Sequence, residues 1–183
     1  MSIRRLHIAQ TDELTQERVT ELIALCEAAF KEPFAALWHR VGPGVHVVAE
    51  VDGTPVAHAM VVDRALHFGG EQGVQIDAGY VEHVATRPDA RHAGHATAVM
   101  REVGRIIDEE YEIGALATGS RAFYEPLGWE LWRGPTFVRS QDGEWLRSSD
   151  SDGHVMVLRT SRTPADLDVA SPIAVDWRPG EPW

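Results

Sequence analysis

The stretch YVEHVATRPDARHAGHATAVM, residues 80–100, decides the fold class and suggests the chemistry of this chain. Its first part, up to Thr86, contains a single carboxylate, Glu82, within a run that has the composition of a strand. A turn rich in small residues follows, and apolar side chains then recur at helical spacing over residues 94–111. We therefore predict a strand, a turn and an amphipathic helix in direct succession.

Further segments before and after this stretch have the patterns of strands and helices. Asp52-Gly53 separates two apolar runs and predicts a hairpin, and Thr15 is a suitable N-cap for a helix in which Val19, Ile23, Cys26 and Phe30 share a face. Other expected strands are RRLHIAQ (4–10), IGALAT (113–118) and HVMVLRT (154–160), with a short helix over 120–127, a surface loop over 140–153 and a tail, 161–183, that packs on the domain. This order predicts an α/β fold with a sheet of mixed direction, not a doubly wound dinucleotide fold.

The composition limits the domain organisation and the partners. The chain has 183 residues, 44% of them hydrophobic, which suits one domain over 1–183. Its 28 acidic and 17 basic residues give a formal charge of −11, which disfavours nucleic acid and accommodates a cationic partner. One cysteine excludes an internal disulfide, and no apolar run is long enough to span a membrane, so we expect a cytoplasmic protein without a membrane partner.

The turn before the helix is a candidate anion site. Helix starts expose N–H groups, and Arg91, Gly94, Ala96 and Thr97 combine a cation with small residues that let a pyrophosphate approach. Neither GxGxxG nor GxxxxGK[ST] occurs in the chain. The residues alone leave two interpretations open, an anion-binding turn and a plain tight turn.

Two motifs in order give a resemblance to a known family. Arg91-x-x-Gly94-x-Ala96 after a strand resembles the acetyl-coenzyme A pyrophosphate loop of the GNAT acyltransferase superfamily, and AFYEPLGWE (122–130) is similar to its second hallmark. Within it, YVEHVATRPD, IGALAT, GWELWRGPT and the terminal DWRPGEPW resemble the aminoglycoside 2'-N-acetyltransferases, over about residues 45–183.

This resemblance implies a GNAT fold, with a mixed, mostly antiparallel central sheet flanked by helices. It implies acetyl-CoA as co-substrate, a cationic aminoglycoside as acceptor, antibiotic resistance as the outcome and a homodimer. Glu82 and Tyr124 would be catalytic, and the tail would close the acceptor side. The implied cofactor-binding residues are Val84, Ala85, Thr86, Arg91, His92, Ala93, Gly94, His95, Ala96 and Thr97. The implied substrate-binding residues are Glu82, His83, Asp150, Ser151, Asp152, Glu181 and Trp183.

The chemistry of amine acetylation agrees with these residue types. It needs a base for the amine, a donor that polarises the thioester carbonyl and a weak acid for the departing thiolate. Glu82, the Val84 N–H and the Tyr124 hydroxyl supply them, and the alternation of side chains along a strand puts Glu82 and Val84 on one face. We expect no metal, because His92 and His95 have no carboxylate or thiol beside them in sequence.

Three departures from the family pattern lie on the acceptor side. His83 follows the base where a smaller residue is expected, Pro33 stands where relatives carry an acidic residue, a place that the neighbouring Glu32 either fills or leaves empty, and Ala117 offers no hydroxyl. The acceptor therefore stays open among a deoxystreptamine aminoglycoside, kasugamycin and a polyamine. The other classes of function are an acyl-CoA-binding sensor without catalysis and, less favoured, protein N-terminal acetylation.

Overall fold

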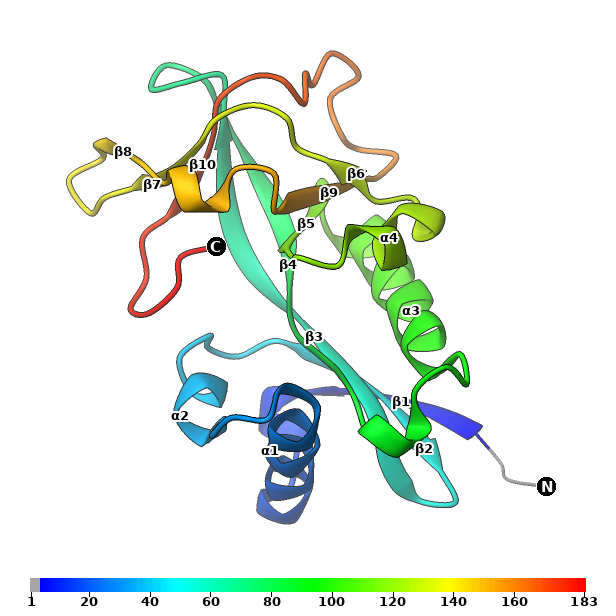
Figure 1. Ribbon diagram of the computed structural model, residues 1–183. Helices are drawn as coiled ribbons and strands as arrows, with labels where there is room; N and C mark the ends of the chain where they lie inside the picture. Colours follow the sequence, from blue (N-terminus) through cyan, green and yellow to red (C-terminus); the bar gives the residue numbers. More distant parts are fainter. Residues whose placement is uncertain (1–3) are drawn as a thin grey trace. The chain divides into compact units, whose positions relative to one another are not determined.

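The computed structural model describes residues 4–183. The chain forms two compact units: unit 1 comprises residues up to 62 together with 81–105, and unit 2 comprises 63–80 together with 106–183. Strands β3 (Thr54–Phe68) and β4 (Val74–Thr86) belong in part to each unit (Figure 1). The single domain expected over 1–183 stays a prediction.

Unit 1 contains an antiparallel sheet of β1 (Arg4–Gln10), β2 (Val45–Val51) and the first half of β3. The β2–β3 connection is the hairpin predicted at Asp52-Gly53. Both turn residues have positive φ, 50° and 82°, as the tightest two-residue turns require. The hairpin sets the register that places His46 and His58 on neighbouring strands, two residues apart along the ladder.

Two helices cover one face of this sheet (Figure 1). A short 3-10 turn, η1 (Thr11–Glu13), leads to α1 (Gln16–Phe30), whose predicted N-cap Thr15 accepts a hydrogen bond from the Arg18 N–H at 3.2 Å. The helix α2 (Ala35–Trp38) follows. The core here consists of Leu22, Leu25, Cys26, Phe34, Trp38, Val48 and Ala85.

The expected apolar face of α1 was wrong at one position. Phe30 is 42% exposed, although Cys26 is buried as expected. The helix ends at Phe30, with Lys31 in a left-handed conformation, and the Phe30 ring stacks on Phe34 at 5.2 Å instead of entering the core. The buried stripe runs through Leu22, Leu25 and Cys26.

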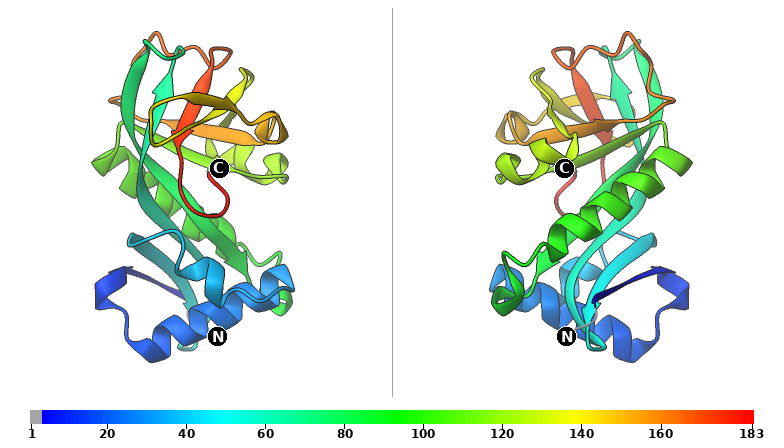
Figure 2. Two further views of the ribbon diagram at one scale, coloured as in Figure 1. Left: turned by 90° about the vertical axis from the view of Figure 1, so that its left-hand side faces the viewer. Right: turned by 90° about the vertical axis from the view of Figure 1, so that its right-hand side faces the viewer.

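The helix α3 (His95–Glu110) confirms the amphipathic helix predicted after the turn (Figure 2). Its first part belongs to unit 1 and its last five residues to unit 2. The buried side chains are Val99, Met100, Val103, Ile106 and Ile107, which recur at intervals of one, three and four. A short 3-10 turn, η2 (Pro88–Ala90), precedes the helix.

Unit 2 is built on a mixed sheet with the strand order β6-β9-β5-β4-β3-β10-β7-β8. β4 pairs in parallel with β5, and β10 with β7, whereas β5–β9, β6–β9, β3–β10 and β7–β8 are antiparallel. The strands are β5 (Ile113–Ala117), β6 (Glu130–Leu131), β7 (Thr136–Arg139), β8 (Trp145–Arg147), β9 (Val155–Arg159) and β10 (Ile173–Asp176). The mixed, mostly antiparallel sheet flanked by helices is confirmed.

The last fifty residues contain two strands that the sequence did not indicate. The segment expected to be a loop, 140–153, includes β8, which forms a hairpin with β7, and the 3-10 turn η4 (Ser149–Ser151). The tail contributes β10 between β3 and β7 (Figure 2). Ile173, Ala174 and Val175 of this strand are fully buried. The expected short helix is α4 (Arg121–Tyr124), continued by η3 (Glu125–Leu127). Within residues 4–183 no helix has the length and apolar character needed to cross a bilayer.

Candidate functional site

The turn between β4 and α3, in unit 1, has the geometry of an anion cradle. His92 and Gly94 both have left-handed backbones, with φ of 62° and 77°, and the Ala98 N–H donates to the Gly94 carbonyl at 3.1 Å to begin α3. Alternating backbone handedness turns successive N–H groups toward one side, and the first N–H groups of a helix have no intrahelical acceptors. A Cβ on Gly94 would meet no atom within 4 Å, so its φ, not lack of space, calls for glycine.

The exposure of the predicted cofactor residues agrees with this geometry. Arg91, His92, Ala93 and Gly94 are exposed, and His95, Ala96 and Thr97 are half-buried at the helix start. The Arg91 guanidinium donates to the carbonyl of Ala29, in the last turn of α1, at 3.0 Å. The Arg91 side chain thus stabilises the carboxyl end of a helix, and the backbone N–H groups of the turn are the candidate donors for an anion.

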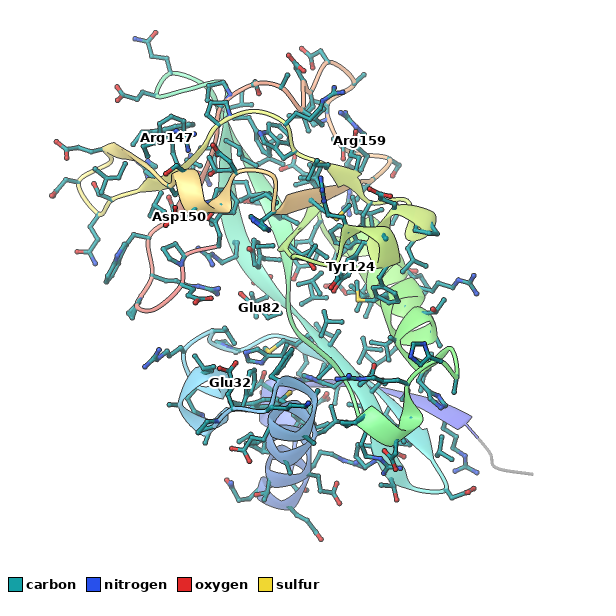
Figure 3. The ribbon with its side chains drawn as sticks, viewed as in Figure 1. Glu32, Glu82, Tyr124, Arg147, Asp150 and Arg159 are labelled. Carbon is teal, nitrogen blue, oxygen red and sulfur yellow. The ribbon has the colours of Figure 1, made fainter. Side chains whose placement is uncertain are left out.

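The end of β4 carries the predicted base in the same unit (Figure 3). Glu82, Val84 and Thr86 are half-buried, whereas their neighbours Val81, His83 and Ala85 are buried. Buried and half-buried residues therefore alternate along this part of β4, as expected for a strand. The strand is nevertheless not regular, because His83 has a φ of 55°. Such a conformation is rare for a residue with a side chain and marks an irregularity between Glu82 and Val84.

The His83 ring packs in the core of unit 1. It stacks on Trp38 at 5.4 Å between ring centroids and meets the edge of Phe34 at 4.8 Å. Only 9% of the residue is exposed. Its predicted contact with the acceptor stays a prediction, and the side-chain packing favours a role in shaping β4.

In unit 2 the predicted acid, Tyr124, ends the short helix α4. Its ring packs edge-on against Phe123 and Trp129, at 4.8 and 6.2 Å between centroids. Burial raises the pKa of Tyr124 to about 12, against the opposing effect of a hydrogen bond with Thr118. The phenol is therefore neutral at physiological pH.

Thr118 is a hydrogen-bond partner of Tyr124 that the sequence did not indicate. It follows β5 directly, and its hydroxyl accepts the Ser120 N–H at 2.9 Å and bonds Tyr124. Ala117, one position earlier, has no hydroxyl and was the position compared with the family pattern. The available signal was a threonine immediately after an apolar strand and six residues before the tyrosine.

In the loop with Asp150, Ser151 and Asp152, the two carboxylates differ: Asp152 is bonded to neighbouring residues, and Asp150 is exposed to solvent. Asp152 accepts the N–H and hydroxyl of Thr136 at 3.0 and 2.9 Å and forms an ion pair with Arg147. The hydrogen bond from Arg147 lowers the pKa of Asp152 to about 2. Asp152 thus ties the loop to β7, whereas Asp150 is exposed (Figure 3) and Ser151 is half-buried.

The tail is fastened to unit 2 beside this loop. Arg64, on β3, donates to the carbonyls of Asp176 and Pro182 at 2.6 and 3.1 Å. The indole N–H of Trp183 donates to the Ser148 hydroxyl at 3.0 Å. Two predicted acceptor-binding groups, the 150–152 loop and Trp183, are therefore brought together, and Glu181 in the tail is exposed. Among residues 4–183 no three His, Cys, Asp or Glu side chains are grouped as metal ligands.

Comparison with known proteins shows the family of this chain and a relative of moderate identity. The profile of the "Acetyltransferase (GNAT) domain" family matches residues 10–132. The chain is 33% identical to the aminoglycoside 2'-N-acetyltransferase of Mycolicibacterium fortuitum over 98% of its own length and 91% of the relative.

Solved structures show the same fold at low sequence identity. The GNAT family N-acetyltransferase YhbS of Escherichia coli, in complex with CoA, matches 96% of this chain and 89% of its own, with a TM-score of 0.66 and 17% identity. Eis1 of Mycobacterium abscessus matches 73% of this chain with a TM-score of 0.60 and 15% identity, and the match spans 32% of Eis1. These likenesses show the fold alone.

Proposed function

Because this chain belongs to the GNAT acetyltransferases, which use acetyl-CoA, we propose that it moves the acetyl group to the 2'-amine of an aminoglycoside. The observation that carries this proposal is the 33% identity, over nearly the whole chain, to a relative named for that reaction. The turn at His92 and Gly94 supports the proposal that acetyl-CoA is the donor, because the backbone geometry of this turn suits a pyrophosphate. Antibiotic resistance, a cytoplasmic location and a homodimer remain predictions.

The transfer joins the acceptor nitrogen to the acetyl carbon and breaks the bond from that carbon to sulfur. We assign Glu82 as the base that removes the amine proton, through a water molecule. The N–H of Val84 would donate to the thioester oxygen as negative charge develops on it. The Tyr124 hydroxyl would donate to the thiolate that leaves.

The raised pKa of Tyr124 makes its role more specific. A phenol with a pKa of about 12 is a weaker acid than an ordinary thiol, whose pKa is about 8.5. Complete proton transfer to the thiolate is therefore unfavourable, whereas a strong hydrogen bond to it is favourable. We accordingly propose stabilisation of the thiolate, with the final proton coming from solvent.

For the acceptor we propose a rim of negative groups in unit 2. Asp150 and Glu181 are exposed, so their carboxylates can pair with ammonium groups of a polycation. Asp152 is already paired with Arg147 and would support this rim indirectly. The formal charge of −11 favours the approach of such a substrate.

The deciding experiment is acetyl-CoA turnover, followed as free thiol, on deoxystreptamine aminoglycosides with and without a 2'-amine, on kasugamycin and on spermidine. We expect turnover confined to the 2'-amino compounds. Turnover on kasugamycin or spermidine alone would retain the acetyltransferase and replace the acceptor. Binding of acetyl-CoA without turnover on any of these amines would favour a sensor.

Glu82→Gln should lower the rate of acetyl transfer by about 10²-fold and leave the affinity for acetyl-CoA intact, because only the base is removed. The matched control is Glu17→Gln, which changes an exposed carboxylate on α1.

A further inference from the structure

A row of buried histidines crosses unit 1 and ends at the irregular residue of β4. The Thr11 hydroxyl lies 3.0 Å from Nε2 of His46, Nδ1 of His46 lies 2.9 Å from Nε2 of His58, and Nδ1 of His58 lies 3.1 Å from the carbonyl oxygen of His83. His46 is 1% and His58 0% exposed. Neither imidazole has a role in the acetyl transfer as described so far.

The hydrogen bonds in this row run in one direction. The His83 carbonyl can only accept, so Nδ1 of His58 carries the proton, and in a neutral ring Nε2 then accepts from Nδ1 of His46. With its proton on Nδ1, the neutral His46 ring presents Nε2 as an acceptor to the Thr11 hydroxyl, which lies 3.0 Å from Nε2 and also 3.0 Å from the Gly44 carbonyl oxygen. Burial lowers the pKa of His46 to about 4 and that of His58 well below its usual value, so both rings are neutral.

One aromatic side chain holds the three rings in place. The indole of Trp38 lies 5.3 Å from the His46 ring and 5.4 Å from both His58 and His83, measured between centroids. Trp38 itself is 5% exposed. A rigid, water-excluded support of this kind makes each hydrogen bond stronger than it is in water.

The end of the row acts on a single peptide group. The carbonyl of His83 and the N–H of Val84 belong to the same planar unit and point in opposite directions. A donor that fixes the carbonyl therefore fixes the direction of the N–H, and it polarises the N–H as well. The left-handed backbone of His83 is strained and persists only if its surroundings hold it.

We propose that His58 is a positioning residue, which aims the Val84 N–H at the thioester carbonyl of acetyl-CoA by holding the other end of the same peptide group. His46 and Thr11 keep His58 in the tautomer that donates at Nδ1. This inference rests on the proposed function only in taking acetyl-CoA as the substrate and Val84 as the donor. It does not depend on the acceptor.

The test is the infrared carbonyl stretch of acetyl-CoA labelled with ¹³C at the thioester carbon and bound to the intact protein. In the wild type the stretch should move to lower wavenumber than in free acetyl-CoA, because a hydrogen bond weakens the C=O bond. His58→Leu should abolish this shift and lower kcat about 10- to 100-fold, with less than about a threefold change in the Kd of CoA, which lacks the carbonyl. His58→Asn, whose amide nitrogen replaces Nδ1, should restore most of the shift.

A matched variant separates positioning from loss of stability. Val48→Ala removes apolar volume from the same core without touching a hydrogen bond of the row, so it should lower the melting temperature and leave the carbonyl stretch unchanged. The proposal is overturned if His58→Leu keeps the full shift of the carbonyl stretch, or if Val48→Ala loses as much of this shift as His58→Leu. It is also overturned if acetyl-CoA bound to the wild type shows no shift. Failure of the aminoglycoside panel would reject the proposed acceptor, and the infrared result would stand independently.

Discussion

At the scale of single residues, the most specific expectation concerns the Tyr124 hydroxyl. Tyr124→Phe keeps the ring against Phe123 and Trp129 and removes only the donor. We expect kcat to fall about 10- to 100-fold, the worth of one hydrogen bond to a charged group, with the Kd of CoA unchanged. Steady-state kinetics with the best acceptor of the panel measure this.

The pH profile and a second tyrosine provide the controls for that prediction. Because the pKa of Tyr124 is about 12, its phenol stays neutral, as the proposed role requires, from about pH 7 to about pH 10. Any loss of kcat in the wild type over this pH range should therefore also be present in Tyr124→Phe. Tyr111→Phe removes a hydroxyl that bonds Asp63 in the same unit and should leave kcat unchanged. Equal losses in both variants would contradict a role at the thiolate.

At the scale of elements, the turn into α3 combines two left-handed residues with a helix start. Gly94→Ala should weaken CoA binding by about tenfold, because an alanine resists the φ of 77° that orients the N–H groups, at a cost of roughly 1–2 kcal/mol. Gly53→Ala is the matched control, since Gly53 has a φ of 82° and equally open space around it, in the β2–β3 hairpin. Thermal unfolding and CoA titration should show similar destabilisation in both and weaker binding only in Gly94→Ala.

At the scale of the whole molecule, the net charge of −11 should affect the two substrates differently. An acidic protein attracts a polycationic acceptor and repels an anionic coenzyme, and salt screens both effects. Raising NaCl from about 20 mM to about 300 mM should lower kcat/KM for the aminoglycoside several-fold, without lowering kcat/KM for acetyl-CoA. An equal fall in kcat/KM for both substrates would mean that salt acts on the protein itself and not on the electrostatic attraction between protein and aminoglycoside.

Much of the fold was predictable from local pattern, because the signals of hairpins and helix starts lie within a few residues. Asp52-Gly53, the Thr15 N-cap and the apolar stripe of α3 are such signals, and the structure confirms all three. β8 and β10 were missed for the opposite reason. A short strand is stabilised by partners that are distant in sequence, as β10 is by β3 and β7, and its own residues carry little of that information.

The sequence by itself determined the fold class, the turn at Arg91–Thr97 and the residue types for an acetyl transfer, since each is set by neighbouring residues or by a short motif. Only the tertiary structure decided that Arg91 stabilises α1, that Asp152 is a brace and that Thr11, His46 and His58 converge on the His83 carbonyl. These hydrogen bonds join segments separated by 12 or more residues. No periodicity encodes such contacts, because they arise only when separate strands and helices pack together.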